Sequence, residues 1–123
     1  MAVNGSALFF NIFKQNTMTY LKEVFEEGNE IAHEAAVKKE GENFMIYPCG
    51  FAWVSLRVPK NDKLGKALEE EGLMTWDSYW KQYSTWVHDH NQSMLHKVAH
   101  AEALAIFLTN KLYSTFTFGS RLD

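Results

Sequence analysis

The run at residues 51–58 constrains the fold most, because small and aliphatic side chains occupy every second position. In an extended strand, successive side chains point to opposite faces. One face therefore carries Ala52, Val54, Leu56 and Val58, and the other carries Phe51, Trp53, Ser55 and Arg57. We expect the first face to pack in the core. The second combines aromatic rings with a guanidinium, which is typical of a surface that faces a ligand or a partner.

Two longer segments carry apolar side chains at the three-and-four spacing of a helix. The first spans about residues 17–39, and its apolar positions are Leu21, Val24, Phe25, Gly28, Ile31, Ala32, Ala35 and Ala36. Its glutamates fall on the opposite side, so we interpret them as a solvated face rather than as paired catalytic carboxylates. The second helix follows Ser93, which can cap it, and continues through Leu112.

Shorter elements fill the segments between these helices. Asn61 or Asp62 can cap a short helix that Gly72 ends. Aromatic and β-branched residues at 78–89 predict a strand, with a helical start at 76–83 as the alternative. A last short strand is predicted at 115–118, after which Gly119 would release a C-terminal tail.

These elements predict one small α/β or α+β domain over residues 1–123. About three strands would form a short sheet packed by three helices, in the order α-β-α-β-α-β. A chain of 123 residues can build such a core without disulfides, and its single cysteine excludes an internal one.

Charge and hydropathy exclude several classes of function. Twelve Lys and Arg against fifteen Asp and Glu give a net charge of −3, so we expect no strong nucleic-acid binding. No apolar run reaches the roughly 18 residues of a membrane span, and the apolar stretch at 7–13 lacks the flanks of a signal peptide. We therefore expect a cytoplasmic protein that does not bind membranes. Aromatic residues make up 15% of the chain, and because interface cores favour them we expect a homo-oligomer.

The densest polar cluster lies between the predicted strand at 78–89 and the last helix. In α/β sheets such junctions bring free backbone N–H groups and the positive end of a helix together, where ligands bind. Aromatic faces stack on planar groups, and arginine pairs with a phosphate or a carboxylate. The candidate ligand-binding residues are accordingly Trp53, Trp86, His88, His90, Asn91, Gln92, Ser93, His100 and Arg121.

Two catalytic alternatives use the same part of the chain. His96 and His100 are four residues apart and share one helical face. With His88 or His90 they could give zinc three imidazoles and an open position for water, although no glutamate between them completes a metalloprotease motif. Cys49 with a histidine would be a thiol nucleophile, although a lone cysteine is more often a small buried hydrophobe.

Several segments together resemble a small family of hypothetical proteins encoded in bacteriophage genomes. The likeness covers residues 48–123 and rests on CGFAWV at 49–54, NQSM at 91–94, AHA at 99–101 and SRLD at 120–123, with Lys97 and Ala103. The resemblance implies a viral accessory protein in the cytoplasm of a bacterial host. Such a protein would counter host defence by binding a host protein or by sequestering a small signalling molecule. The resemblance implies no catalytic role for any residue.

The leading hypothesis is a non-enzymatic protein that binds a small anionic or nucleotide-like ligand, or a host protein. We expect neither a cofactor nor a metal. A small metal-assisted or Cys/His hydrolase is the second hypothesis. The third is a structural protein that forms oligomers through its aromatic residues.

Overall fold

The computed structural model of the chain describes residues 20–38, 50–88 and 94–122. Within these ranges lie three helices and four strands, and the strands form one antiparallel sheet. After a first helix at residues 20–38, the elements are β1 (Gly50–Leu56), α2 (Lys63–Glu70), β2 (Thr75–Asp77), β3 (Gln82–Trp86), α3 (Met94–Leu112) and β4 (Phe116–Leu122). The mixed α/β class predicted from the sequence is confirmed.

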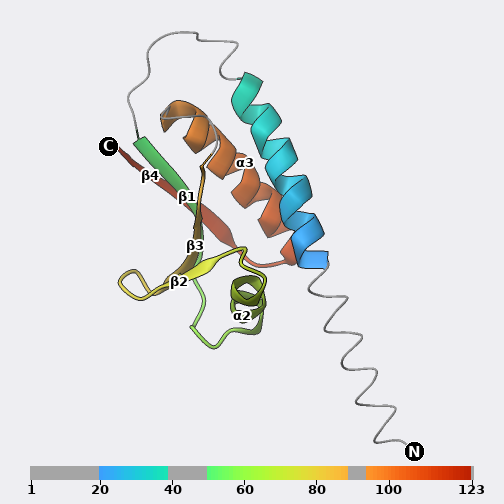
Figure 1. The fold of residues 1–123 in the computed structure, drawn as a ribbon, viewed down its shortest axis with the longest axis vertical. Helices are drawn as coiled ribbons and strands as arrows, with labels where there is room; N and C mark the ends of the chain where they lie inside the picture. The colour runs from blue at the N-terminus through green and yellow to red at the C-terminus, as the bar shows by residue number, and fades with distance from the viewer. Residues whose placement is uncertain (1–19, 39–49, 89–93, 123) are drawn as a thin grey trace, which may run out of the picture.

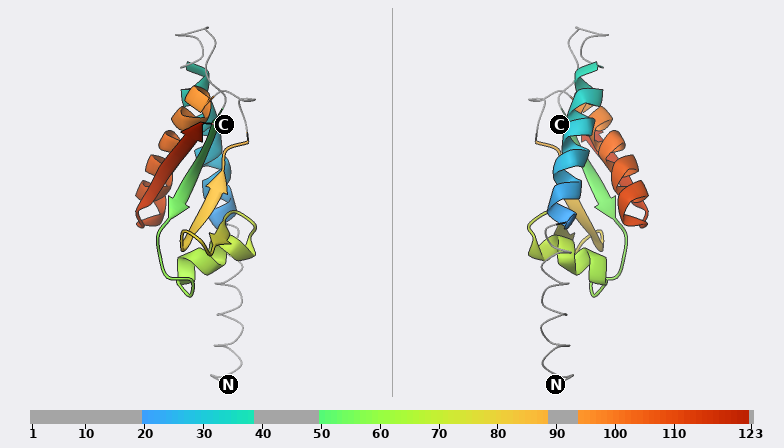
Figure 2. Two further views of the ribbon diagram at one scale, coloured as in Figure 1. Left: turned by 90° about the vertical axis from the view of Figure 1, so that its left-hand side faces the viewer. Right: turned by 90° about the vertical axis from the view of Figure 1, so that its right-hand side faces the viewer.

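The sheet has the order β2-β3-β1-β4, with every neighbouring pair antiparallel, so β1 is paired along both edges. α3 connects β3 to β4 and lies beside the first helix on one side of the sheet, whereas α2 lies at one end, near β2 (Figure 1). In the left-hand view of Figure 2 the strands lie in front of the first helix. No described helix covers the opposite face of the sheet.

The alternation predicted for β1 is confirmed. Ala52, Val54 and Leu56 are at most 1% exposed and belong to the core that the sheet shares with α3 and the first helix. Burying each of the two larger aliphatic side chains stabilises the fold by about 1.5–3 kcal/mol. Phe51 and Trp53 are half-buried on the other face.

The first helix packs the predicted apolar stripe against the core, with Leu21, Val24, Phe25, Ala32 and Ala36 buried. Its glutamates are exposed, as expected. Ile31 differs from the prediction because it is 43% exposed. The 3.6-residue period of the helix places this position at the margin of the stripe. None of the helices in the described ranges combines the length and hydropathy needed to cross a membrane.

β3 (Gln82–Trp86) forms within the strand predicted at 78–89 but is shorter. The segment at 76–83 does not form the alternative helix. It contains the β2–β3 hairpin, in which Asp77 Oδ1 accepts the N–H groups of Tyr79 and Trp80 at 2.9 and 3.1 Å. β2 has only three residues, too few to show an alternating pattern in the sequence. The predicted count of about three strands is therefore one too low.

The last strand is longer than predicted. β4 runs through Leu122 rather than ending at Gly119, because Gly119 pairs with Trp53 inside the ladder. Arg121 therefore lies on a strand and not on a tail. This difference matters for the site described below, because a strand fixes the direction of its side chains.

Tyr83 of β3 fixes α2 against the sheet. Its ring packs so closely over Gly65 that a Cβ atom there would overlap it, and its hydroxyl donates to the Lys60 carbonyl. As predicted, Asp62 caps α2, and its side chain accepts the Gly65 N–H at 3.1 Å. Gly72 follows the helix with a φ of 71°, a conformation that glycine adopts without strain.

Burial raises the pKa of the Tyr83 phenol above its ordinary value, and the negative charges of Glu69 and Asp62 add to this shift. The unfolded phenol ionises near pH 10, whereas the folded one keeps its proton to higher pH. In that range the folded state binds more protons than the unfolded state. The free energy of unfolding must therefore fall as the pH rises above about 10.

We predict that Tyr83→Phe lowers the free energy of unfolding at pH 7 by about 1 kcal/mol, because the hydrogen bond to Lys60 is lost. The difference between the variant and the wild type should shrink as the pH rises above about 10. Denaturant unfolding of both proteins at several pH values measures both effects. Tyr79→Phe, at an exposed side chain, is the matched control and should behave as wild type. A wild-type stability that falls with pH no faster than that of Tyr83→Phe would contradict this account.

Candidate ligand-binding face

We call the face of the sheet that no helix of the described residues covers the uncovered face, and it carries the aromatic residues predicted for the site. The register places Trp53 of β1 opposite Trp86 of β3 and Gly119 of β4, and it places Phe51 opposite Arg121. Side chains of directly paired residues point to the same face of a sheet. Phe51, Trp53, Trp86 and Arg121 therefore gather on this face, and we call them the aromatic cluster.

The rings of the aromatic cluster pack edge to face or at a tilt. The ring centroids of Trp53 and Trp86 are 5.1 Å apart with an interplanar angle of 47°, and those of Phe51 and Trp86 are 5.7 Å apart at 82°. The guanidinium carbon of Arg121 lies 5.4 Å from the Phe51 centroid and 6.0 Å from that of Trp86. A guanidinium held against aromatic faces keeps the N–H groups in its plane available to a phosphate or a carboxylate.

Gly119 makes room for the Trp53 indole. A Cβ atom at residue 119 would lie 2.7 Å from the indole ring, closer than any real contact of this kind. The indole therefore lies over the β4 backbone. The absence of a side chain at this position allows the approach.

A second cation lies beside Phe51. The Lys97 ammonium, from α3, is 5.6 Å from the Phe51 centroid, although the Lys97 side chain is only 6% exposed. In the part of the chain that the structure describes, no carboxylate forms an ion pair with Lys97 or Arg121. Two cations near one ring, neither paired with a carboxylate of the described residues, create a positive potential that favours an anion.

A hollow of about 340 Å³ extends from the aromatic cluster along the sheet to the β2–β3 loop. At its far end Arg57 Nε donates to Gln82 Oε1 at 3.2 Å. Trp80, which is mostly exposed, lines the same end. Asp77 also lines the hollow, and its Oδ1 already accepts the two N–H groups of the loop. A hollow of this volume is in the range of small-molecule sites.

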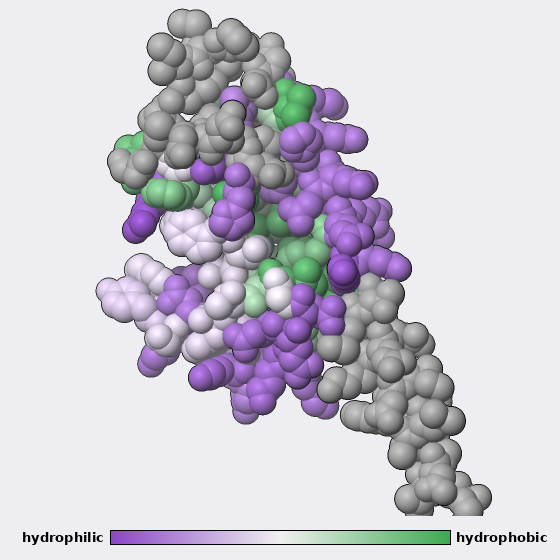
Figure 3. All heavy atoms as spheres, in the orientation of Figure 1, coloured by the Kyte–Doolittle hydropathy of each residue, from purple (hydrophilic) through white to green (hydrophobic). Residues whose placement is uncertain are grey.

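The surface colouring agrees with this division of the molecule. In Figure 3 the surface over β2 and β3 is mostly pale, which means intermediate hydropathy, whereas the outer flank of the first helix is strongly hydrophilic. Tryptophan, tyrosine, serine and threonine have such intermediate hydropathy and predominate on β2, β3 and their loop.

Two histidines of the predicted site, His88 and His100, line a hollow next to the one that Trp53 and Arg121 line. His100 is 2% exposed between α3 and the first helix, where its Nε2 is 2.9 Å from Asn29 Oδ1. His88 is exposed just after β3. Both line a hollow of about 290 Å³ that Trp86 also borders.

The structure thus brings three of the predicted ligand-binding residues together, namely Trp53, Trp86 and Arg121. It places His88 and His100 in a neighbouring hollow. The other four, His90, Asn91, Gln92 and Ser93, lie outside the described residues.

The catalytic alternatives gain no support from the described residues. Among them, no three His, Cys, Asp or Glu side chains are placed to hold a metal ion. His96 is buried on α3. Cys49 and His90, like the apolar stretch at 7–13, lie outside the described residues. Both forms of the hydrolase hypothesis stay predictions.

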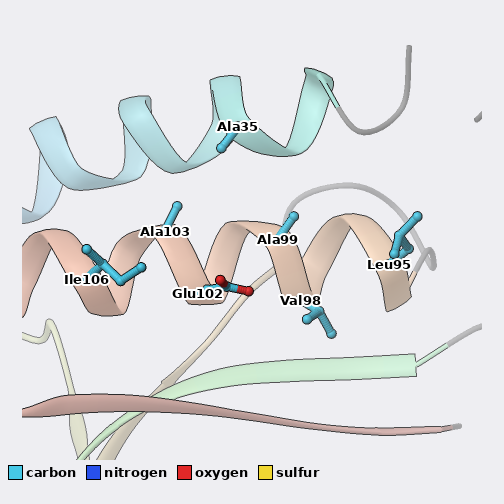
Figure 4. Close-up of a pocket in the computed structure, with 7 residues that line it drawn as sticks. All are labelled: Ala35, Leu95, Val98, Ala99, Glu102, Ala103 and Ile106. Atoms are coloured by element: carbon cyan, nitrogen blue, oxygen red, sulfur yellow. The ribbon is translucent and has the colours of Figure 1, made fainter. Parts of the chain in front are cut away.

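A further hollow lies between the two long helices (Figure 4). Ala35 on the first helix points toward α3, and Ala99 and Ala103 on α3 point toward the first helix. Glu102 is the charged residue in its lining, and the rest is apolar. Because it lacks convergent polar groups that could orient a ligand, we attribute this hollow to the packing of small side chains.

Four residues near the aromatic cluster or its hollow were not among the predicted ligand-binding residues, namely Phe51, Arg57, Trp80 and, from α3, Lys97. The alternation in the sequence placed Phe51 and Arg57 on the same strand face as Trp53, so a signal for both existed. The position of Trp80 in the hollow depends on the conformation of the β2–β3 loop, which the sequence does not predict. No local pattern predicts that the Lys97 ammonium lies beside Phe51.

Comparisons with known proteins assign no family to the chain. No family model, no curated protein and no solved structure matches it. The resemblance to a bacteriophage family, the cytoplasmic location and the homo-oligomer therefore stay predictions.

We predict that Gly119→Ala displaces the Trp53 indole, because the added methyl group would overlap it. The near-ultraviolet circular dichroism of the tryptophans should change, since it depends on how Trp53 and Trp86 face each other. Ser120→Ala, at the next and exposed position of β4, is the matched control and should keep the wild-type spectrum. Identical spectra for Gly119→Ala and the wild type would show that Trp53 does not lie over residue 119.

Proposed function

We propose that the protein is a non-enzymatic binding protein that takes a small nucleotide-like anion on its uncovered sheet face. The observation that carries this proposal is the Arg121 guanidinium, which lies over both Phe51 and Trp86. A guanidinium that can bind an anion and an exposed aromatic ring thus lie within a few ångströms of each other. A nucleotide presents the complementary pair, a flat base and a phosphate.

Stacking supports the base-binding part of the proposal. Trp86 is 41% exposed, and Trp53 stands beside it at a tilt. Every base has a π face, and stacking a base on an aromatic side chain stabilises a complex by about 1–3 kcal/mol. The cluster therefore suits a base without selecting strongly among bases.

Charge supports the anion-binding part. A phosphate can accept two parallel hydrogen bonds from the Arg121 guanidinium. The Lys97 ammonium also lies over the Phe51 ring and adds to the positive potential. Phe51, Trp53 and Trp86 offer ring faces and Arg121 offers a permanent cation, and these groups suit the binding of a planar anion.

We predict that uridine 5′-monophosphate quenches the tryptophan fluorescence saturably and that Arg121→Ala weakens its binding more than tenfold. A hydrogen bond to a charged group contributes about 1.5–3 kcal/mol, which corresponds to a change of this size or larger. The Tm should fall only slightly, because Arg121 is exposed and an exposed cation–π contact, such as those with Phe51 and Trp86, contributes about 0.5–1 kcal/mol. Lys22→Ala removes an exposed cation from the first helix and is the matched control, with wild-type affinity expected.

Ribose 5-phosphate separates the two parts of the proposal, because it has the phosphate without the base. It should bind at least fivefold more weakly than the nucleotide, since the stacking of the base is lost. Equal affinities of Arg121→Ala and the wild type for the nucleotide would overturn the proposal, as would the absence of any binding at millimolar concentration.

A further inference from the structure

Building on the proposed function, we infer that the ligand is a guanine nucleotide whose base is read by Arg57 and Asp77. The hollow beside the aromatic cluster has two polar ends. Arg121 lines one end, and Arg57, Asp77 and Gln82 line the other. A single nucleotide fills a hollow of about 340 Å³, so a phosphate held by Arg121 leaves the base directed toward the second group.

The register of the sheet connects the two ends. Asp77 of β2 pairs with Gln82 of β3, and Gln82 lies four positions before Trp86 on the same strand, so these side chains share the uncovered face. Four positions of a strand cover about 13 Å. A purine that stacks on Trp86 spans much of this distance, and the long side chains of Arg57 and Gln82 can span the rest.

Gln82 orients the guanidinium of Arg57. Gln82 is 6% exposed, and its Oε1 accepts the Nε–H of Arg57 at 3.2 Å. Because Nε is engaged, the two terminal nitrogens keep a pair of parallel N–H groups for a ligand. No carboxylate of the described residues forms an ion pair with Arg57. The adjacent O6 and N7 atoms of guanine accept such a pair of hydrogen bonds.

Asp77 offers a carboxylate oxygen to the same base. Its Oδ1 accepts the N–H groups of Tyr79 and Trp80, which fixes the carboxylate in the loop. Its Oδ2 accepts no hydrogen bond from the residues that the structure describes. Beside O6, guanine carries N1–H and the 2-amino group, and both are donors that a carboxylate oxygen accepts. Asp77 thus matches the donors of guanine as Arg57 matches its acceptors.

The two opposite charges favour guanine over the other bases and over a second phosphate. Adenine has an amino donor where guanine has O6, so it would turn a donor toward the Arg57 guanidinium. Uracil offers O4 without an adjacent second acceptor. A second phosphate at Arg57 would meet the negative charge of Asp77. Of the common bases, guanine satisfies both side chains.

Isothermal titration calorimetry with a set of nucleoside 5′-monophosphates tests the inference. The guanosine compound should bind at least about tenfold more tightly than the adenosine and uridine compounds, because they lack its contacts with Arg57 and Asp77. Inosine 5′-monophosphate, which lacks only the 2-amino group, should bind at least about fivefold more weakly than the guanosine compound. Equal affinities for the guanine and adenine nucleotides would overturn the inference.

Adenosine 3′,5′-bisphosphate tests whether Arg57 receives a second phosphate instead of a base. It should bind within about threefold of adenosine 5′-monophosphate, because Asp77 disfavours the added negative charge. An affinity equal to that of guanosine 5′-monophosphate would show that the far end of the hollow binds phosphate, and the inference would be wrong.

Arg57→Lys keeps the charge of the side chain but removes the parallel pair of N–H groups. The preference for guanosine over adenosine 5′-monophosphate, given as the ratio of the two Kd values, should fall to about threefold or less. Lys66→Gln, which removes an exposed cation on α2 outside the hollow, is the matched control and should keep the wild-type preference. An undiminished preference in Arg57→Lys would contradict the inference.

Asp77→Asn keeps Oδ1 for the two loop N–H groups and replaces Oδ2 by an amide donor. The preference for guanosine over inosine 5′-monophosphate should disappear, since an amide N–H cannot accept the 2-amino group. Glu70→Gln, at an exposed carboxylate on α2 outside the hollow, is the matched control and should keep this preference. Persistence of the preference in Asp77→Asn would exclude Asp77 as the group that reads the base.

The two proposals fail in different ways. If the nucleotides all bind through Arg121 with equal affinity, guanine is excluded as the selected base and the nucleotide-like anion remains. If none of them binds at millimolar concentration, the proposed function itself is wrong.

Discussion

β1 is paired along both edges, and the alternation of its side chains couples the core of the protein to its uncovered face. Ala52, Val54 and Leu56 must face the helices for the sheet to pack. Because the period of a strand is two, the same register directs Phe51 and Trp53 outward. A slip of one residue would place indoles in the core and aliphatic side chains in solvent, so the register of the sheet and the geometry of the aromatic cluster are fixed together.

The two neighbours of β1 complete the surface. β3 contributes Trp86 and β4 contributes Arg121, and each is held by backbone pairing rather than by a loop. Such placement limits the number of orientations that a side chain can adopt. A ligand that binds there loses little affinity to ordering the protein. At the other end of the hollow the β2–β3 loop carries Trp80, and the Asp77 side chain orders this loop through two hydrogen bonds.

Much of the local structure was predictable from the sequence, because it depends on neighbouring residues. The alternation at 51–58, the Asp62 cap and the glutamate face of the first helix are patterns within a few residues of each other. The pairing of Trp53 with Trp86 and Gly119 was not predictable, since it joins segments more than 30 residues apart. The sequence contains a tryptophan at 86 and a glycine at 119, but only the register shows that one indole lies over the glycine and packs beside the other.

The environment of His100 illustrates the same limit. The sequence places His100 one helical turn after His96, and α3 confirms this spacing. The direction in which that face of α3 points depends on how α3 packs against the first helix. There His100 meets Asn29, on the covered side of the sheet. Arg121 differs from His100, because the sequence predicts it on a C-terminal tail whereas it lies on a strand beside the aromatic rings. β4 continues past Gly119 and holds Arg121 there.

The most direct test of the uncovered face as a binding surface is the NMR spectrum of the four tryptophan indole N–H groups during titration with uridine 5′-monophosphate. Trp53 and Trp86 should shift saturably. Trp76 packs edge to face against the buried ring of Tyr83, and its indole N–H resonance should not shift. Shifts confined to Trp76, or no shift in any indole at millimolar nucleotide, would contradict the account.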